Sequence, residues 1–412
     1  MSLIKPFAGL RPADGRADDV VAPPYDVVSS SEARALAQGR PWSFLHISRP
    51  EIDLPAGTDP YASEVYAKAA ENLNLMVSEG VLVRDDKPCY YAYRLTMGGH
   101  VQTGLVAAAS VEAYDADRIK KHEFTRPVKE DDRVRQIEAL NAQTGPVFLV
   151  YKANETVDGI LGAVTAQPPA VDVTAADGVR HELWVIADED SIERLTAAFD
   201  AMAALYVADG HHRSAAGSRV GNARREADAG HTGEESYNFF LTVIFPHDQM
   251  HILDYNRVVK DLNGLDEAAF LERVGERFRV QPSTDPVRPS RPAEFGMYLG
   301  GRWYRLQLDD AKIPDDPVAS LDVSLLADNL IEPVLGISDP RRDERIDFVG
   351  GIRGLGELEK RVDSGEWAVA FALFPTTMDA LMAVADAGEV MPPKSTWFEP
   401  KLADGLVSHV LD

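Results

Sequence analysis

Apolar residues recur at helical spacing in one long segment near the start of the chain. Between Tyr61 and Glu79 a single helical face collects Val65, Tyr66, Ala69, Leu73, Met76 and Val77. Gly80 follows directly, and glycine is the residue that most often ends a helix. We therefore predict an amphipathic helix over residues 61–79 whose apolar face packs against a core.

Alternating and continuous apolar runs predict strands in the first two thirds of the chain. Cys89–Thr96 and Val101–Ala113 are β-prone and are joined by Met97-Gly98-Gly99-His100, which has the composition of a hairpin turn. Further predicted strands cover residues 146–151, 204–208, 239–245 and 251–259. Helical patterns at residues 127–142 and 214–225 lie among them, so this part is predicted to form an α/β domain.

The pattern after Gly264 indicates a second domain of the α+β type. Phe295–Leu308 contains a Gly300-Gly301 hairpin signal, Leu321–Ile331 has helical periodicity, and Trp367–Phe374 resembles a buried strand. A chain of 412 residues exceeds the size at which one core usually keeps growing. We predict two domains, residues 1–264 and 265–412; the Pro- and Arg-rich segment 281–292 is an alternative boundary.

Composition and charge restrict the class of ligand. Lys and Arg number 42 against 66 Asp and Glu, so the net charge is −24 and nucleic acid is an unfavoured partner. A small anionic molecule needs only a local basic pocket. Cys89 is the single cysteine, no apolar run approaches a membrane span, and the start lacks a signal-peptide pattern. These features predict a cytoplasmic protein that does not enter a membrane.

The turn Ala208-Asp209-Gly210-His211-His212-Arg213 is the sharpest candidate for chemistry. It joins the strand at 204–208 to the helix at 214–225, and a helix that starts after a glycine presents unpaired N–H groups at its positive end. Gly210, His211, His212 and Arg213 are therefore predicted to bind phosphate. Asp209 is a candidate catalytic group that holds a nucleotide-borne metal, orients a histidine or caps the helix. The alternative is a capped helix with surface histidines.

A charged loop precedes Pro127, which suits the first turn of the next helix. Glu123 and His122 are candidate catalytic bases, because carboxylates and imidazoles accept protons near neutral pH. The basic side chains of the stretch are candidate substrate ligands: Lys121, Arg126, Lys129 and Arg133. The alternative interpretation is a solvated run of charge.

The segment Met391–Lys401 is held extended by prolines and presents a cation beside two hydroxyls. Lys394, Ser395 and Thr396 suit phosphate oxygens, so we predict that they bind substrate and that the segment folds back to the first-domain site. The alternative is a tail packed by Trp397 and Phe398. P-loop, dinucleotide, zinc-peptidase and serine-hydrolase motifs are missing or have the wrong spacing, and no metal site of the protein's own is predicted.

Several motifs together resemble one bacterial and archaeal family. They are Ile4-Lys5-Pro6-Phe7, Ala22-Pro23-Pro24-Tyr25-Asp26, Lys121-His122-Glu123, Ala208-Asp209-Gly210-His211-His212-Arg213 and Met391-Pro392-Pro393-Lys394-Ser395-Thr396. The family is known as domain of unknown function 1015 and brings no settled activity. The turn itself is locally similar to the nucleotide-phosphate turn of the ParB and sulfiredoxin superfamily, which includes ParB CTPases, sulfiredoxin and nucleotide-dependent free-serine kinases.

This second resemblance implies a ParB/sulfiredoxin-like nucleotide-binding domain whose turn, from Gly210 to Arg213, grips the phosphates of ATP or ADP with Mg²⁺. Thr125-Arg126-Pro127 is loosely similar to a basic element upstream of the turn. We therefore predict phosphoryl transfer to or from a small metabolite, with a serine-like free amino acid as the first guess. A ParB-like nucleotide switch that binds DNA and a non-catalytic metabolite sensor are the alternatives. The oligomeric state stays open.

Overall fold

The computed structural model describes residues 2–412, and contacts divide the chain into two compact units. Unit 1 comprises residues 1–250 and 400–412, and unit 2 comprises residues 251–399. Gly264, the predicted boundary, lies inside unit 2, while residues 400–412 belong to unit 1. The predicted domains 1–264 and 265–412 therefore differ from the contact units at both ends, and the domain boundary stays a prediction.

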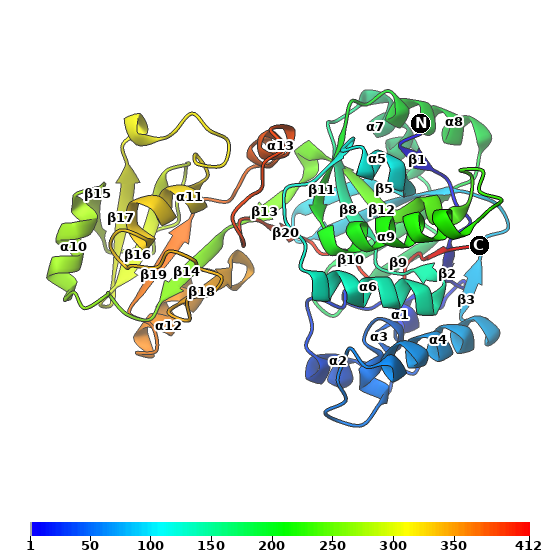
Figure 1. The fold of residues 1–412 in the computed structure, drawn as a ribbon, viewed down its shortest axis with the longest axis horizontal. Helices are drawn as coiled ribbons and strands as arrows, with labels where there is room; N and C mark the ends of the chain where they lie inside the picture. The colour runs from blue at the N-terminus through cyan, green and yellow to red at the C-terminus, as the bar shows by residue number, and fades with distance from the viewer. Residues whose placement is uncertain (1) are drawn as a thin grey trace. The chain divides into compact units, whose positions relative to one another are not determined.

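Unit 1 is built on a mixed nine-stranded sheet, drawn in Figure 1. The strand order is β6-β11-β8-β12-β5-β4-β10-β9, and β1 pairs with β5. The bounds are β1 Ile4–Lys5, β4 Tyr90–Met97, β5 His100–Ser110, β6 Ile119–Lys120, β8 Val147–Tyr151, β9 Val171–Thr174, β10 Arg180–Ile186, β11 Leu205–Asp209 and β12 Phe239–Pro246. Two pairs are parallel, β11 with β6 and β12 with β8, and the others are antiparallel.

Helices and two small strand pairs complete unit 1. The helices are α1 Ala17–Val20, α2 Ser30–Ala37, α3 Leu45–Ser48, α4 Ser63–Ser78, α5 Val111–Asp115, α6 Pro127–Leu140, α7 Glu155–Val164, α8 Glu189–Asp200 and α9 His211–Ala227. β2 (Leu10–Pro12) pairs with β3 (Leu82–Arg84), and β7 (Ala142–Gln143) pairs with β21 (His409–Val410). The β7–β21 pair ties the end of the chain to the segment that follows α6.

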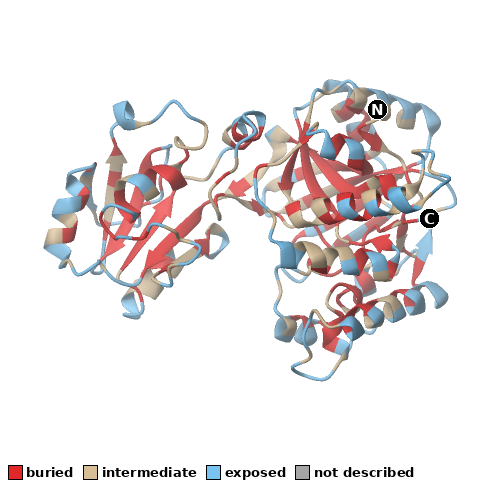
Figure 2. Cartoon of the chain, in the orientation of Figure 1, coloured by how far each residue is buried: buried red, intermediate tan, exposed pale blue. Residues whose placement is uncertain are grey.

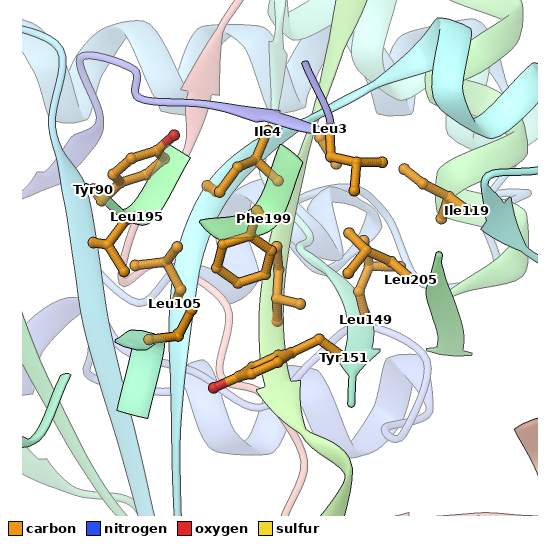
Figure 3. Packing of buried hydrophobic residues seen from close by; sticks show 14 of the residues in the cluster. Leu3, Ile4, Tyr90, Leu105, Ile119, Leu149, Tyr151, Leu195, Phe199 and Leu205 are labelled. Carbon is orange, nitrogen blue, oxygen red and sulfur yellow. The ribbon is translucent and has the colours of Figure 1, made fainter. Parts of the chain in front are cut away.

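A hydrophobic cluster of unit 1 lies between the sheet and helices α7 and α8. Figure 3 shows Phe199 and Leu195 of α8 packed among residues of the sheet such as Leu105, Leu149 and Tyr151. In Figure 2 the strands of the large sheet are buried, whereas the helices alternate buried and exposed residues. This pattern is that of amphipathic helices covering a sheet, and it confirms the predicted α/β class.

Unit 2 contains a six-stranded antiparallel sheet in the order β15-β17-β16-β19-β14-β18. Its strands are β14 Tyr255–Val259, β15 Phe278–Ser283, β16 Glu294–Leu299, β17 Arg302–Leu308, β18 Ile346–Gly350 and β19 Val369–Leu373; β13 (His251–Leu253) pairs with β20 (Trp397–Glu399). The helices are α10 Glu267–Gly275, α11 Asp322–Leu326, a π-helical turn Ala327–Ile331, α12 Leu355–Asp363 and α13 Met378–Asp386. Leu358 of α12 is buried in the cluster that covers one face of the sheet.

Most predicted elements exist, and one was assigned wrongly. The helix predicted over residues 61–79 is α4, although Val77 lies on its exposed side. The hairpins at Gly98-Gly99 and Gly300-Gly301 are confirmed. The run 251–259 was expected to be one strand of the first domain, but it is two strands interrupted at Asp254, and β14 lies in the sheet of unit 2.

Within residues 2–412, no helix combines the length and apolar character that crossing a bilayer requires. The cytoplasmic location stays a prediction from the sequence.

Candidate functional site

The turn between β11 and α9 depends on the backbone conformation of Gly210. Gly210 caps α9 with a left-handed backbone (φ 93°, ψ 29°), which side-chain-bearing residues rarely adopt. A Cβ added there would lie 2.9 Å from Nε of Arg213. The Gly210 carbonyl accepts the N–H groups of Arg213 and Ser214 at 2.8 and 3.0 Å. The N–H groups of His211 and His212 therefore stand at the start of the helix without helical acceptors.

Arg213 is the cation at this helix start, and its side chain is only 10% exposed. One guanidinium nitrogen donates to the Pro146 carbonyl, and Nη2 lies 3.8 Å from both Asp26 and Asp209. Within residues 2–412, the buried Nε has no hydrogen-bond partner. Burial by itself would lower the pKa of Arg213. The two carboxylates have the larger effect, so the pKa lies above its usual value. The group is thus a fixed cation with an unused donor.

Asp209 is an ionised carboxylate with partners of its own. Lys401 donates to it at 3.0 Å, and the Gly210 N–H donates at 2.8 Å. Burial favours the neutral acid, yet Lys401 and Arg213 outweigh that effect and hold the pKa of Asp209 well below its usual range. Asp209 therefore has no proton to donate at neutral pH, and its charge is already neutralised by the ammonium group.

Two histidines pack against each other beside the turn. The buried rings of His122 and His211 meet edge to face at 4.5 Å between centroids. Nε2 of His211 accepts the backbone N–H of His122 at 3.4 Å, so Nδ1 carries the proton and faces Glu123 at 3.7 Å. Burial lowers the pKa of His122 to about 4 and that of His211 well below its usual value. Both rings are neutral at pH 7.

The charged loop reaches the turn through part of its length. Glu123 approaches His211, and its side chain is 54% exposed. The backbone N–H of Arg126 donates to Nε2 of His212 at 3.0 Å. Glu123, His122 and the backbone of Arg126 therefore lie at the turn. Their chemical roles stay predictions.

The remaining basic residues of the stretch have partners of their own, and Arg133 also lies on the wall of a small cavity beside Arg213. Lys121 donates to the Tyr114 carbonyl at 3.0 Å. Lys129 donates to the Tyr61 hydroxyl at 2.9 Å. Arg133 donates to Asp132 and stacks over the ring of Tyr25, with 3.9 Å from its central carbon to the ring centroid. Substrate binding by these three side chains stays a prediction.

The predicted ligands Lys394, Ser395 and Thr396 belong to unit 2. Lys394 is exposed and has a positive φ of 61°. The Ser395 hydroxyl donates to the Pro392 carbonyl at 2.6 Å, so its proton is already used. The predicted approach of this segment to the turn stays a prediction.

A small cavity opens beside Arg213, and its lining combines Arg133 and Arg213 with residues that the sequence did not mark as site candidates. Its volume is about 30 Å³, room for one or two water molecules, and its walls include Tyr25, Arg133, Arg213 and Asp404. The Asp404 side chain is buried and accepts the Tyr25 N–H at 3.2 Å. Burial raises the pKa of Asp404 to about 7 although Arg213 opposes the shift.

For some of the site residues that were not predicted, the sequence did contain a signal. Tyr25 and Asp26 follow a double proline, and Lys401 ends the extended segment 391–401, so each lay in a stretch that the sequence singled out. Asp404 had no such signal, since it comes from the chain end that returns to unit 1 and pairs with Ala22 in an isolated β-bridge. Across residues 2–412, no group of three or more His, Cys, Asp or Glu side chains is arranged to hold a metal ion.

A model of the family described as Protein of unknown function (DUF1015) matches residues 4–324. The chain belongs to the DUF1015 family. The predicted membership is therefore confirmed, whereas the ParB-like character of the turn stays a prediction. No curated protein matches this DUF1015 chain.

Solved structures similar to this DUF1015 protein share little sequence with it. A free serine kinase in complex with AMP is 14% identical, with a TM-score of 0.34 over 72% of this chain and 86% of that one. SbnI with a C-terminal truncation, from Staphylococcus aureus, is 14% identical, with a TM-score of 0.37 over 71% and 82%. A conserved hypothetical protein from Pyrococcus furiosus is 14% identical, with a TM-score of 0.32 over 72% and 90%. Likenesses at this level carry no argument about what the chain does.

Proposed function

We propose that unit 1 binds a nucleotide or phosphate ester at the Asp209–Arg213 turn and transfers a phosphoryl group to or from a small metabolite. The observation that carries the proposal is the buried Nε of Arg213, a charged donor without an acceptor among residues 2–412, at the start of α9. Phosphate oxygens accept such donors together with the free N–H groups of a helix start. Gly210, His211 and His212 supply the backbone around the phosphate.

The nucleotide is ATP or ADP, and its Mg²⁺ is part of the proposal. Mg²⁺ bound to a nucleotide usually takes one or two protein carboxylates besides phosphate oxygens. Asp26 and Asp209 flank Arg213 at 3.8 Å and are the carboxylates that would contact it. A cation brought by the ligand would also offset the negative charge of Asp26, since Asp209 is already paired with Lys401.

The chemistry at this turn is positioning and charge stabilisation. Phosphoryl transfer needs aligned groups and neutralised oxygens more than covalent participation by the protein. Glu123 is the proposed base, because it is exposed to an incoming acceptor and faces Nδ1–H of His211. His122 is the weaker choice, since its pKa near 4 makes it a poor proton acceptor. A free amino acid such as serine is the first acceptor to test, on the turn's local similarity to free-serine kinases.

Binding is tested by replacing Arg213 and a matched arginine on the same helix. Calorimetric titration of ADP with Mg²⁺ is expected to show at least a tenfold loss of affinity in Arg213→Met, since a hydrogen bond to a charged group contributes about 1.5–3 kcal/mol. Arg219→Met is the control, because Arg219 lies on α9 but pairs with Glu130 and Asp131. Equal affinity in the wild-type protein and Arg213→Met, with circular dichroism unchanged, would remove the proposed site.

Turnover is tested separately from binding. Glu123→Gln keeps the shape of the side chain and removes the base, so phosphoryl transfer is expected to fall by 100-fold or more while ADP affinity changes only a few-fold. Glu138→Gln, an exposed position on α6, is the control. A loss of affinity as large as the loss of rate would assign Glu123 a structural role.

A non-catalytic nucleotide sensor is the second candidate. It is favoured by the ion pair between Lys401 and Asp209, which neutralises the carboxylate most suited to a metal. The sensor predicts tight ADP binding with no transfer to any acceptor in a broad panel of metabolites. Transfer to one acceptor that disappears in Glu123→Gln would exclude it.

A further inference from the structure

Unit 2 contains a buried arginine with no negative partner. Arg257 lies on β14, an interior strand between β19 and β18, and 6% of the residue is exposed. One end of its guanidinium donates to the Tyr255 carbonyl, and Nη2 donates to the Lys394 carbonyl at 3.0 Å. Throughout residues 2–412, it makes no ion pair and no other hydrogen bond.

The carboxylate nearest in sequence has a different partner. Asp254 is buried, takes an ion pair from Arg288 at 3.3 Å and accepts a hydrogen bond from Asn256. Burial therefore lowers the pKa of Arg257 to about 10, with only the Tyr255 hydroxyl opposing the shift. Charged groups taken into a protein interior are normally paired, because an uncompensated charge is costly there. Arg257 is an exception that calls for a counter-charge.

A second cation lies beside the first. The Lys394 ammonium is 5.5 Å from the centroid of the Tyr255 ring, and the Arg257 guanidinium carbon is 6.0 Å from the same centroid. Lys394 is exposed and has no carboxylate partner in residues 2–412. Thr396, two residues further, has a hydroxyl that makes no hydrogen bond in the same described part of the chain. Two cations thus lie near one aromatic ring, and the hydroxyl of Thr396 follows two residues after the second cation.

We propose that Arg257, Lys394 and Thr396 form a binding site in unit 2 for a small oxyanion, the phosphate or carboxylate group of a ligand. Guanidinium, ammonium and hydroxyl groups all donate to oxyanions, and a negative group in this place would supply the charge that Arg257 lacks. The ring of Trp397 packs edge to face on Tyr255, with 5.2 Å between centroids, and so lies next to the site. The proposal is independent of the phosphate turn, because it uses different cations.

The test follows Trp397 directly. The full chain is labelled with 5-fluorotryptophan, the Trp397 resonance is assigned with Trp397→Phe, and sodium phosphate and sodium citrate are titrated separately at constant ionic strength. At least one of the two anions is expected to shift the Trp397 resonance with saturation. Arg257→Met is expected to weaken that titration about tenfold and Lys394→Ala about threefold, in line with one buried and one exposed charged donor. Lys360→Ala, an exposed lysine of α12, is expected to change nothing.

The outcomes separate the ligand classes. A response to phosphate alone assigns a phosphate group, and a response to citrate alone assigns a carboxylate. The proposal is overturned if neither anion moves the Trp397 resonance, or if the titration is the same in Arg257→Met and Lys394→Ala as in the wild-type protein. If Arg257→Met does not fold, Arg257→Lys and Lys394→Ala take its place: the first is expected to keep binding within a few-fold, and the second to weaken it. Because Trp397 belongs to unit 2, the failure of either proposed site leaves the other testable.

Discussion

Arg213 in unit 1 and Arg257 in unit 2 are both largely shielded from solvent and donate to main-chain carbonyls, but the charges around them differ. Arg213 has Asp26 and Asp209 within 3.8 Å, whereas Arg257 has no carboxylate partner in residues 2–412. The pKa of Arg213 is accordingly raised and that of Arg257 is lowered to about 10. Burial alone therefore does not predict which kind of ligand an arginine binds. The charges of the neighbouring side chains do.

The two surroundings imply two ways of binding an anion. Near Arg213 lie the carboxylates of Asp26 and Asp209 and the buried Asp404, whose pKa is raised to about 7 by burial first and by Asp26 to a smaller extent. A phosphate that approaches this turn is favoured when it carries a cation such as Mg²⁺. Near Arg257 the unmatched charge is positive, so a bare phosphate or carboxylate suits it. Four substitutions test this contrast.

The largest effect is expected from removing the paired arginine. Arg213→Met leaves Asp26 and Asp209 with less positive charge, and breaking a buried ion pair costs about 3 kcal/mol of unfolding free energy. Arg257→Met leaves no charge unpaired and loses two hydrogen bonds to carbonyls, about 1–2 kcal/mol. Urea unfolding followed by ¹⁹F signals of Trp184 in unit 1 and Trp303 in unit 2 measures each loss. A larger loss in Arg257→Met would reverse the comparison.

An intermediate effect is expected at Gly210. The φ of 93° is strained for alanine, and the added Cβ would lie 2.9 Å from Nε of Arg213. Gly210→Ala is therefore expected to lower the unfolding free energy by about 1–2 kcal/mol and to weaken ADP binding by displacing Arg213. Gly159→Ala, on α7 with nothing near its Cβ position, is the control and is expected to be neutral or stabilising. Unchanged ADP affinity in Gly210→Ala would separate the glycine from the site.

The smallest effect is expected from replacing Asp404, and its sign depends on pH. Asp404 has a pKa of about 7 when folded, above the value near 4 expected when unfolded, so the folded protein holds more protons between roughly pH 4 and pH 7. Its contribution to stability is full below pH 4 and is lost progressively as the pH rises from 4 through 7. Asp404→Asn is expected to remove this slope and to be more stable than wild type at pH 8.

The control and the contradicting result are both measurable in the same series. Asp14→Asn changes a fully exposed carboxylate and is expected to keep the wild-type pH dependence. If Asp404→Asn were less stable than wild type at pH 8, the carboxylate of Asp404 would be needed as a partner of Arg213. The negative charge of the carboxylates around Arg213 would then be balanced by the nearby cations.

The sequence predicted those parts of the fold that depend on local pattern. The face of α4, the two glycine hairpins and the β11–turn–α9 junction follow from periodicity and from the demands of Gly210. The division of 251–259 into β13 and β14 was missed, because an apolar run does not reveal which sheet will accept it. That choice depends on pairing with strands about 100 residues away, which a local pattern does not contain.

The candidate site likewise has one part that the sequence predicted and another part that it did not. Arg213 and the histidines were visible as a motif, and the charged loop supplied Glu123 and Arg126. Lys401 and Asp404 reach the turn only because the end of the chain returns to unit 1. Arg257 was not selected at all, since a single arginine in a strand resembles any other until the surrounding charges are known.

The return of residues 400–412 sets the order in which the phosphate turn can be completed during synthesis. Asp209 leaves the ribosome early, but its partner Lys401 and the strand β21 follow only after all of unit 2 has been translated. At about 5–20 residues per second, that delay is on the order of ten seconds. During this interval the nascent chain carries Asp209 without the ammonium group that balances its charge, so a ribosome stalled before residue 400 would display an unfinished turn.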